Sequence, residues 1–432
     1  MNKVNIESQL ISLCFNKSIH PMHDGNKGCS LFFDSASIGL KGSHVENHIV
    51  DGDWKSTVNF AKDSFARVIN SSNSHISLFH NTTSAVQRVL TQLNNYSPFQ
   101  GSTLVTTDVE YPGIYAASNE IWEGPICVIQ VSDLIYNCNS INEDKIFERI
   151  STAIKLVKPT VLYFSHITRS QGYVFDIDRI SKFADQVLPY KFLIVDGAQS
   201  IGNIHVDIEK LPLIDAYVTS GHKWLCGPQH IGILYSDPKW RLEDPAQSYS
   251  ETVKSSGTGN RDVISKFSIA LQYFVKDGKS FTKEIGGFNN SLANYFAVNL
   301  GNAFEIIGGK NYSKRSGIVV FRPKQKNLKM EEVGEIQNAK KQSKKNRKSY
   351  SFAHLHPEEV PFLPWSSIRL RYILKEIKSF KHCHFTPEKI DSGLFIQHTG
   401  QWFRACFHFY HDKNAVINLI RGLNQALKKE LK

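Results

Sequence analysis

Two side chains in the middle of the sequence, Asp196 and Lys223, have the types and spacing that chemistry on a bound carbonyl compound requires. Asp196 follows the apolar run 191–195, and Lys223 lies 27 residues further on, shortly after the run 217–219. Lysine is a costly residue at the end of a buried strand, because its ammonium group loses water there unless a partner compensates. Lys223 therefore either extends to the surface or is held inside for its amine.

The ends of the neighbouring apolar runs carry polar residues of complementary chemistry. They are Asn81, Thr82 and Thr83, then Glu110 and Tyr111, then His166 and Arg169, and finally Gln199, Ser220 and His222. Ligands bind beyond the carboxyl ends of the strands in an open α/β sheet. A lysine that forms a Schiff base, a carboxylate for a pyridine nitrogen, hydroxyls at a helix N-terminus for a phosphate and a planar side chain over a ring are together the requirements of pyridoxal 5'-phosphate (PLP). The sequence therefore predicts PLP as the cofactor.

The elements that must position these residues are short apolar runs separated by polar or helical segments. The runs are 75–79, 103–106, 126–131, 160–164, 191–195, 217–219 and 231–235, and the clearest intervening helices are 84–93 and 177–187. Runs that are apolar on both faces are typical of a mostly parallel sheet covered by helices on both sides. The last run follows its predecessor too closely for a helical crossover, so we expect that pair to be antiparallel. The prediction is an α/β fold with a mostly parallel seven-stranded sheet.

A second, smaller α+β domain is predicted at the C-terminal end. Its expected elements are a helix at 290–307, strands at 317–321, 391–397 and 404–410, and an amphipathic helix at 414–431. We expect an N-terminal segment over residues 1–45, a large PLP-binding domain over 46–285, and a small domain over 286–432 with a basic insertion at about 322–385.

Composition excludes several classes of protein. The chain of 432 residues is 41% hydrophobic and 21% charged and has no long uncharged apolar run, so we expect no membrane span and a cytoplasmic location. Its seven cysteines include no CxxC pair, which fits a reducing compartment. The triplet 382–384, His-Cys-His, lacks a second ligand cluster, so no metal site is predicted.

The net charge of +11 is concentrated in one part of the sequence. Residues 310–348 contain thirteen lysines and arginines but only three acidic residues. The core of this region, residues 338–349, has no apolar periodicity and no interleaved aromatic residues for base stacking, so a solvated loop is favoured over a nucleic-acid-binding surface.

The motifs Asp196-Gly-Ala-Gln199 and Ser220-Gly-His222-Lys223, followed by Gly-Pro at 227–228, resemble the class V aminotransferase family of fold type I PLP enzymes. This family includes cysteine desulfurases, selenocysteine lyases and isopenicillin-N-epimerase-like enzymes. Further similar motifs occur in the same order at 33–36, 81–85, 257–260 and 403–405. The resemblance covers nearly the whole chain from about residue 31, apart from the insertion.

The resemblance implies a role for each matching residue. Lys223 would carry the internal aldimine and act as the acid and base at Cα, while Asp196 would pair with the pyridine nitrogen and Gln199 with the phenolic oxygen. The phosphate would be held by Thr82, Thr83, Ser220 and His222, and by Thr258 from the partner subunit of a homodimer. Tyr111 would stack on the ring, Arg404 would bind the substrate carboxylate, and Arg169 and His166 would lie near the substrate.

Each role has a purely structural alternative. Lys223 could form a structural ion pair with Asp196. An ordinary helix cap would account for Thr82 and Thr83, and Tyr111 could be a core aromatic residue. Arg404 could brace the small domain, Arg169 could face solvent, and His166 could be a satisfied histidine at a strand end.

The segment before Arg404 departs from the cysteine desulfurase pattern, because residues 396–403 contain no cysteine to form a persulfide. Cys406 is expected in the core, and the sequence leaves open whether Cys383 acts as the nucleophile. We therefore predict a transferase or lyase that acts on a carboxylate-bearing amino acid by transamination or by C–S or β-elimination. The alternatives are an amino-acid epimerase of the isopenicillin N type, a cysteine desulfurase, and a non-enzymatic basic nucleic-acid-binding protein. The sequence leaves open which bond at Cα is broken.

Overall fold

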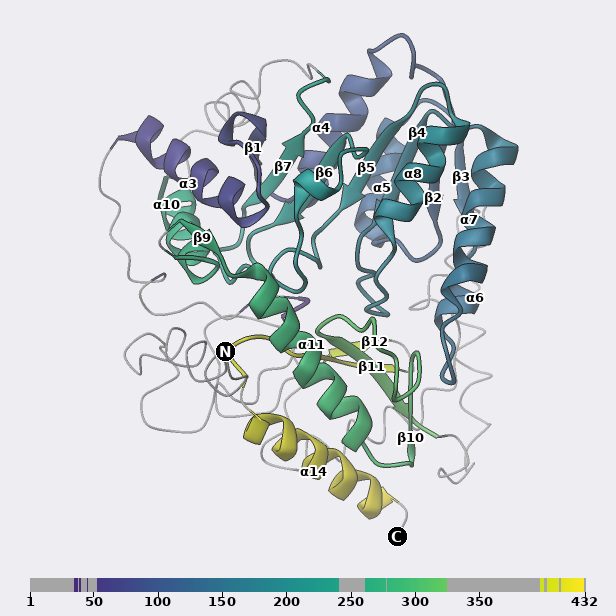
Figure 1. The fold of residues 1–432 in the computed structure, drawn as a ribbon, viewed down its shortest axis with the longest axis vertical. Helices are drawn as coiled ribbons and strands as arrows, with labels where there is room; N and C mark the ends of the chain where they lie inside the picture. Colours follow the sequence, from purple (N-terminus) through teal and green to yellow (C-terminus); the bar gives the residue numbers. More distant parts are fainter. Residues whose placement is uncertain are drawn as a thin grey trace, which may run out of the picture.

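The structure is a computed structural model that describes residues 35–37, 39, 45, 53–240, 261–276, 278–324, 397–399, 402–411 and 413–430. Within these residues it contains a large sheet flanked by helices and a smaller sheet packed beside two long helices (Figure 1). Thr258, Cys383 and nearly all of the basic insertion lie outside the described residues.

The large sheet has seven strands in the order β1-β7-β6-β5-β4-β2-β3. The strands are β1 (Ile76–Phe79), β2 (Leu104–Thr107), β3 (Ile126–Ile129), β4 (Val161–Ser165), β5 (Phe192–Asp196), β6 (Ala216–Ser220) and β7 (Gly232–Ser236). Neighbours from β3 to β6 pair in parallel, whereas β7 is antiparallel to both β6 and β1. The predicted fold class and the antiparallel pairing of the last two strands are therefore confirmed.

Alternation along the strands divides the large core into two layers. In β5, Leu193 and Val195 join one cluster of buried side chains, while Phe192 and Ile194 join the other. This follows from the two-residue repeat of a strand, and it explains why a sheet covered on both faces appears in sequence as continuous apolar runs.

Helices cover both faces of the large sheet (Figure 1). The elements on the side of the larger cluster are α3 (Trp54–Val68), α7 (Glu143–Val157), α8 (Ile177–Val187) and α10 (Arg261–Ala270). The opposite side is covered by α4 (Thr82–Asn94) and α5 (Pro112–Ile121), and the short α6 (Ser132–Ile135) follows β3. Short 3-10 turns lie at Asn73–His75, Ile208–Lys210 and Leu271–Tyr273, and a small hairpin joins β8 (Val275–Lys276) to β9 (Lys279–Ser280).

The smaller sheet is antiparallel, with the order β10-β11-β13-β12. Its strands are β10 (Phe304–Ile306), β11 (Ile318–Pro323), β12 (Gln397–Thr399) and β13 (Trp402–Cys406). A separate core cluster joins this sheet to α11 (Thr282–Asn299) and α14 (Lys413–Glu430). The closing helix was expected at 414–431 and agrees closely with α14.

The helix expected at 290–307 is wrong at both ends. The observed α11 begins at Thr282 and ends at Asn299, and residues 304–306 form β10 instead. Gly286 lies inside the helix, where its lack of a side chain lets α11 pack closely against the backbone of Ile204. A Cβ at this position would lie only 3.0 Å from that backbone. The domain boundary at 285/286 falls inside α11 and stays a prediction.

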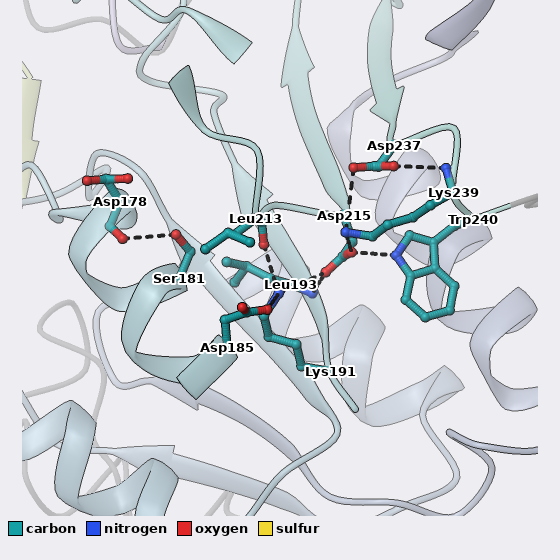
Figure 2. Close-up of polar contacts among 10 residues, drawn as sticks. All are labelled: Asp178, Ser181, Asp185, Lys191, Leu193, Leu213, Asp215, Asp237, Lys239 and Trp240. Carbon is teal, nitrogen blue, oxygen red and sulfur yellow. Dashed lines mark hydrogen bonds and ion pairs between the residues drawn. The ribbon is translucent and has the colours of Figure 1, made fainter. Parts of the chain in front are cut away.

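Asp215 organises a polar network at the amino-terminal edge of the sheet (Figure 2). This fully buried carboxylate accepts hydrogen bonds from the backbone amide of Leu193, at 2.7 Å, and from the indole of Trp240. It also forms ion pairs with Lys239 at 2.8 Å and with Lys191 at 3.8 Å. These four neighbours are all donors or cations, so the charge of Asp215 is matched within the chain.

No helix among the described residues is long and apolar enough to cross a membrane. The same residues contain no group of three or more histidine, cysteine or acidic side chains arranged to hold a metal ion. The triplet 382–384 lies outside the part of the chain that the structure describes.

Candidate active site

Lys223 lies in a tight turn beyond the carboxyl end of β6. The turn is closed by the amide of Gly227, which donates to the carbonyl of Gly221 at 2.9 Å, and by the amide of Cys226, which donates to the carbonyl of Lys223 at 3.1 Å. A Cβ on Gly221 would lie 2.4 Å from Ile231, so glycine is required for this close packing. The backbone around Lys223 is therefore fixed by its neighbours, and its side chain is partly buried.

His408, which follows β13 of the smaller sheet, fixes the position of Trp224, the residue after Lys223. The ring of His408 stacks on Trp224 with centroids 5.2 Å apart, and its Nε2 donates to the Trp224 carbonyl at 2.7 Å. The Trp224 indole in turn donates to Gln199 Oε1 at 2.8 Å. These contacts connect the turn that carries Lys223 to the segment after β5.

A cavity of about 360 Å³ opens at this edge of the sheet. Its lining comes from six separate parts of the chain: Ala36 and Ser37; Asn81, Thr82 and Thr83; Tyr111 and Ile114; Ser165, Ile167 and Arg169; Asp196, Ala198 and Gln199; and His222 and Lys223. Eight of the residues to which the sequence assigned a role therefore share one cavity, at the edge where ligands bind in open α/β sheets.

Asp196 ends β5 as a nearly buried carboxylate on the cavity wall. Its Oδ2 accepts a hydrogen bond from the Tyr163 hydroxyl at 2.7 Å, and its Oδ1 accepts one from the Ala198 amide at 2.8 Å. Burial raises the pKa of Asp196 although the Ala198 amide and the charge of Lys223 oppose this change. A cationic group bound in the cavity would favour the ionised carboxylate.

The electrostatic environment keeps more of the Lys223 amine in its neutral, nucleophilic form than is usual for a lysine. Burial lowers its pKa from 10.5 to about 8, against the opposing charge of Asp196. The nearby guanidinium groups of Arg169 and Arg404 lower this pKa further. A substantial fraction of the amine is therefore neutral, with its lone pair available, near physiological pH.

Three buried polar atoms gather where α4 begins beside the ends of β6 and β7. They are Thr82 Oγ1, Ser220 Oγ and His222 Nδ1, and none has a hydrogen-bond partner among the described residues. Ser220 pairs with Gly232, and a Cβ at Gly232 would lie only 2.2 Å from the backbone of Asn81. Glycine thus allows β7 to approach the start of α4 closely.

This group of atoms fits a phosphate. Buried polar atoms without partners are rare, because each costs about 1 to 3 kcal/mol. Asn81 caps α4 through a reciprocal pair of contacts with Ser84, so the Thr82 hydroxyl is not needed as the cap. The N-terminus of a helix also favours an anion. Burial lowers the pKa of His222 to about 3, so its imidazole is neutral and can donate one hydrogen bond.

Tyr111 supplies a flat aromatic surface to the cavity. It precedes α5, whose first residue is Pro112, and its ring lies so close to Gly113 that a Cβ there would be 2.7 Å from it. Tyr111 is 40% exposed, and the Lys223 Nζ lies 5.9 Å from the centroid of its ring. This half-open aromatic face suits contact with a planar ligand.

Gln199 and the N-terminal segment lie together against the cavity. The Gln199 Nε2 donates one of its two hydrogens to the Ala36 carbonyl at 2.9 Å, which leaves its second hydrogen for another acceptor. The Gly39 amide donates to the His222 carbonyl at 2.7 Å. Ala36 and Ser37 therefore line the cavity, and hydrogen bonds join Ala36 to Gln199 and Gly39 to His222.

Three of the expected site residues do not line the cavity. Ser220 lies behind it, and Arg404 is fully buried in β13. His166 is buried at the end of β4, where its Nδ1 lies 2.9 Å from the Tyr217 hydroxyl. Burial lowers the pKa of His166 to about 4, and its geometry is that of the structural alternative, a satisfied histidine. Thr258 lies outside the described residues, so its role stays a prediction.

Glu110 and Tyr163 were not assigned a role from sequence. Glu110 is buried, and its carboxylate accepts hydrogen bonds from the Thr107 hydroxyl at 2.7 Å and from both the amide and the hydroxyl of Ser165. Burial raises its pKa to about 7 against these hydrogen bonds. The sequence gives little indication that these two residues belong to the site, because they reach it only through the pairing of β4 with its neighbouring strands.

The fold and this cavity define a fold type I PLP enzyme architecture, and comparison with known proteins identifies the family. The Aminotransferase class-V family model matches residues 39–267, more than half of the chain, so the protein belongs to the class V aminotransferase family. Pyridoxal phosphate is the cofactor of this family, as the sequence predicted.

Individual relatives differ in their reactions. The chain is 27% identical over 186 residues to an isopenicillin N epimerase of Streptomyces clavuligerus, a match that covers 43% of this chain and 44% of the epimerase. It is 26% identical over 194 residues to the cysteine desulfurase IscS of Methylobacillus flagellatus, a match that covers 44% of this chain and 42% of the desulfurase. The matched segments thus span less than half the length of these curated relatives.

The whole fold is shared with solved structures. A C-DES mutant with glycine covalently linked to its PLP cofactor has a TM-score of 0.66, with 16% identity over 91% of this chain and 96% of that protein. At this level of identity the match concerns the fold.

Proposed function

We propose that the protein is a PLP-dependent enzyme that acts on a carboxylate-bearing amino acid, by transamination or by C–S or β-elimination. The observation that carries this proposal is that a lysine of lowered pKa, a buried carboxylate and an aromatic face line one cavity, next to three buried polar atoms that have no partner among the described residues. Lys223, Asp196 and Tyr111 would hold the ring, and Thr82, Ser220 and His222 the phosphate.

The bound cofactor supplies an electron sink that stabilises negative charge at the substrate Cα. The residues of this chain do the remaining work. The Lys223 amine would accept and return a proton at Cα, because its pKa of about 8 matches that task near neutral pH. Asp196 would keep the pyridine nitrogen protonated, and Arg404, whose charge acts on Lys223 from behind the cavity wall, would orient the substrate α-carboxylate.

An epimerase is the second candidate. The relatedness to isopenicillin N epimerase favours it. A desulfurase is less well supported, because none of the four cysteines in the described part of the chain lines the cavity. Cys406 is buried in the core, and burial raises the pKa of Cys138 to about 11, so neither resembles a reactive thiolate.

The test is the visible absorbance of purified protein after addition of PLP. Wild type should acquire a band above about 400 nm that Lys223→Ala lacks. Lys210→Ala, a change at a largely exposed lysine, is the control and should keep the band. Absence of the band from wild type would refute the proposal. Assays for keto acid, ammonia and inverted stereochemistry would then separate transamination, elimination and epimerisation.

A homodimer in which Thr258 completes the partner's site also stays a proposal. Sedimentation analysis of the PLP-loaded protein should give a dimer, and Thr258→Ala should weaken PLP binding. A monomer with unchanged PLP affinity would contradict it.

A further inference from the structure

Arg169 presents its guanidinium group from a rigid turn. Ile167 and Val174 form an antiparallel bridge, and the Thr168 amide donates to the Tyr173 carbonyl at 2.9 Å. Gly172 closes the turn with a positive φ of 68°, and a Cβ there would lie 2.7 Å from Ile318. The position of Arg169 relative to the cavity is therefore set by packing.

The Arg169 side chain lies on the cavity wall beside the aromatic face. Its guanidinium carbon lies 5.2 Å from the centroid of the Tyr111 ring, a distance at which cation–π attraction operates. The residue is partly buried, and its charge lowers the pKa of the Lys223 amine. A positive charge is thus held close to the amine that would do the chemistry.

Arg404 contributes a second guanidinium group from behind the wall. It is fully buried, and its Nη1 donates to the backbone carbonyl of Arg169 at 2.9 Å while its Nη2 donates to Ser37 Oγ at 2.8 Å. Arg404 also lowers the pKa of Lys223. One arginine therefore lines the cavity, and a second supports the wall of the cavity from behind.

Two cationic side chains and one anionic side chain act on the Lys223 amine. In the described residues the charged groups that act on the pKa of Lys223 are Arg169, Arg404 and Asp196, and Asp196 would be matched by the pyridine nitrogen. The candidate phosphate ligands Thr82, Ser220 and His222 are neutral and belong to other segments. One bidentate guanidinium is enough for one α-carboxylate, so a second guanidinium group close to the same amine provides the charge to bind a second anion.

We infer that Arg169 is a specificity-determining residue that binds a second anionic group on the substrate side chain. The substrate class is then an acidic amino acid, with a carboxylate, sulfinate or sulfonate on its side chain. This inference rests on the proposed function, and it narrows the substrate from any amino acid to an anionic one.

The experiment measures equilibrium binding of unreactive carboxylates to the PLP-loaded protein by calorimetry. Glutarate and succinate carry two carboxylates, whereas valerate and butyrate carry one. Wild type should bind the dicarboxylates at least about 10-fold more tightly. Arg169→Gln should weaken dicarboxylate binding about 10-fold to 100-fold, because a charge-assisted hydrogen bond contributes that much, and should leave monocarboxylate binding within about 3-fold.

The matched control is Arg179→Gln. Arg179 also lies over an aromatic ring, 3.8 Å from the centroid of Phe147, but on the surface outside the cavity. Arg179→Gln should leave the affinities for glutarate, succinate, valerate and butyrate unchanged. L-Aspartate and L-glutamate should likewise change the visible band at lower concentration than L-asparagine and L-glutamine in wild type, and this preference should be lost in Arg169→Gln.

Three outcomes would overturn the inference. Equal weakening of monocarboxylates and dicarboxylates in Arg169→Gln would place Arg169 on the α-carboxylate. A loss of PLP affinity alone would assign it to the cofactor, and wild-type protein without a dicarboxylate preference would remove the basis of the inference. Failure of the proposed function is distinct from all three, since it would appear as a missing visible band before any carboxylate is added.

Discussion

The two buried aspartates at opposite edges of the large sheet, Asp215 and Asp196, have opposite kinds of surroundings. At the amino-terminal edge, Asp215 is matched by two lysines, an indole and a backbone amide (Figure 2). At the carboxyl-terminal edge, Asp196 has an elevated pKa and lies in a cavity beside buried polar atoms that have no partner among the described residues.

The lysines beside these aspartates differ in the same way. Burial alone would lower the pKa of Lys239, but the hydrogen bond and charge of Asp215 outweigh burial and raise it. At Lys223 burial prevails over Asp196 and the pKa falls to about 8. A network whose charges are paired within the chain stabilises the fold. A network with buried polar atoms that lack a partner in the chain can bind a ligand through those atoms.

The largest expected difference is between Asp215→Asn and Asp196→Asn. Four donors converge on the Asp215 carboxylate, so the amide hydrogens of an asparagine would point at one of these donors. Loss of the charge would leave the buried Lys191 with Asp185, 3.7 Å away, as its acidic partner. Unfolding by urea should show a loss of about 2 to 3 kcal/mol for Asp215→Asn. Asp196 receives only two hydrogen bonds, and one comes from a hydroxyl that can also accept, so Asp196→Asn should change stability by less than about 1 kcal/mol and reduce turnover instead. Equal destabilisation by both changes would abolish the distinction.

Glu110→Gln should change how stability depends on pH. The folded protein holds the Glu110 proton up to a pKa of about 7, whereas the unfolded chain releases it near 4.5. Folding therefore binds a proton in this window, and wild-type stability should fall as pH rises from about 4.5 to 7. Glutamine does not titrate, so this fall is absent in the variant. Relative to wild type, the free energy of unfolding of the variant should be higher by at most about 3 kcal/mol at pH 8 and by little at pH 4. Parallel stability curves across this range would show that Glu110 is not buried as described.

Removing unpartnered hydroxyls should weaken cofactor binding without weakening the fold. Ser220→Ala should leave the stability of the PLP-free protein unchanged or slightly higher, because the Ser220 hydroxyl has no partner to lose among the described residues. PLP affinity should fall about 10-fold, the effect of one lost hydrogen bond to a charged group. Thr107→Val is the matched change at a buried hydroxyl that has a partner, Glu110, and it should destabilise the PLP-free protein. Destabilisation by Ser220→Ala would indicate that its hydroxyl already has a structural role.

The smallest expected effect concerns the pKa of Lys223. The rate at which PLP-free protein takes up PLP should rise with pH around a midpoint near 8, because only the neutral amine reacts. Arg169→Gln removes a nearby cation and should move this midpoint upward, and Asp196→Asn removes an anion and should move it downward. Stopped-flow absorbance over a pH series measures both shifts. Midpoints that do not move in either variant would show that the charges of Arg169 and Asp196 do not affect the pKa of Lys223.

Sequence indicated the parts of the fold that depend on local pattern. The strand positions of the large sheet agree to within a few residues, because continuous β-branched and apolar runs have few alternatives to a buried strand. The helix at 290–307 was misplaced because Gly286 and Gly287 resemble a break in sequence, whereas Gly286 is a contact with the backbone of Ile204. Tertiary packing decided this element, and local propensity does not report it.

The same division applies to the site. Asp196, Lys223 and Tyr111 follow strands in sequence, so the rule for strand ends was enough to bring them together. Glu110, Tyr163 and the burial of Arg404 depend on which strands become neighbours, which the order of residues along one chain does not specify.

The most direct test is to map the lysine that carries the cofactor. PLP-loaded protein would be reduced with borohydride, digested, and analysed by mass spectrometry, which locates the covalently fixed cofactor on one peptide. We predict label on Lys223, with none on Lys191 or Lys239 of the Asp215 network. Label on either of those two lysines, or protein that retains no label, would contradict the assignment of Lys223 as the cofactor-binding residue.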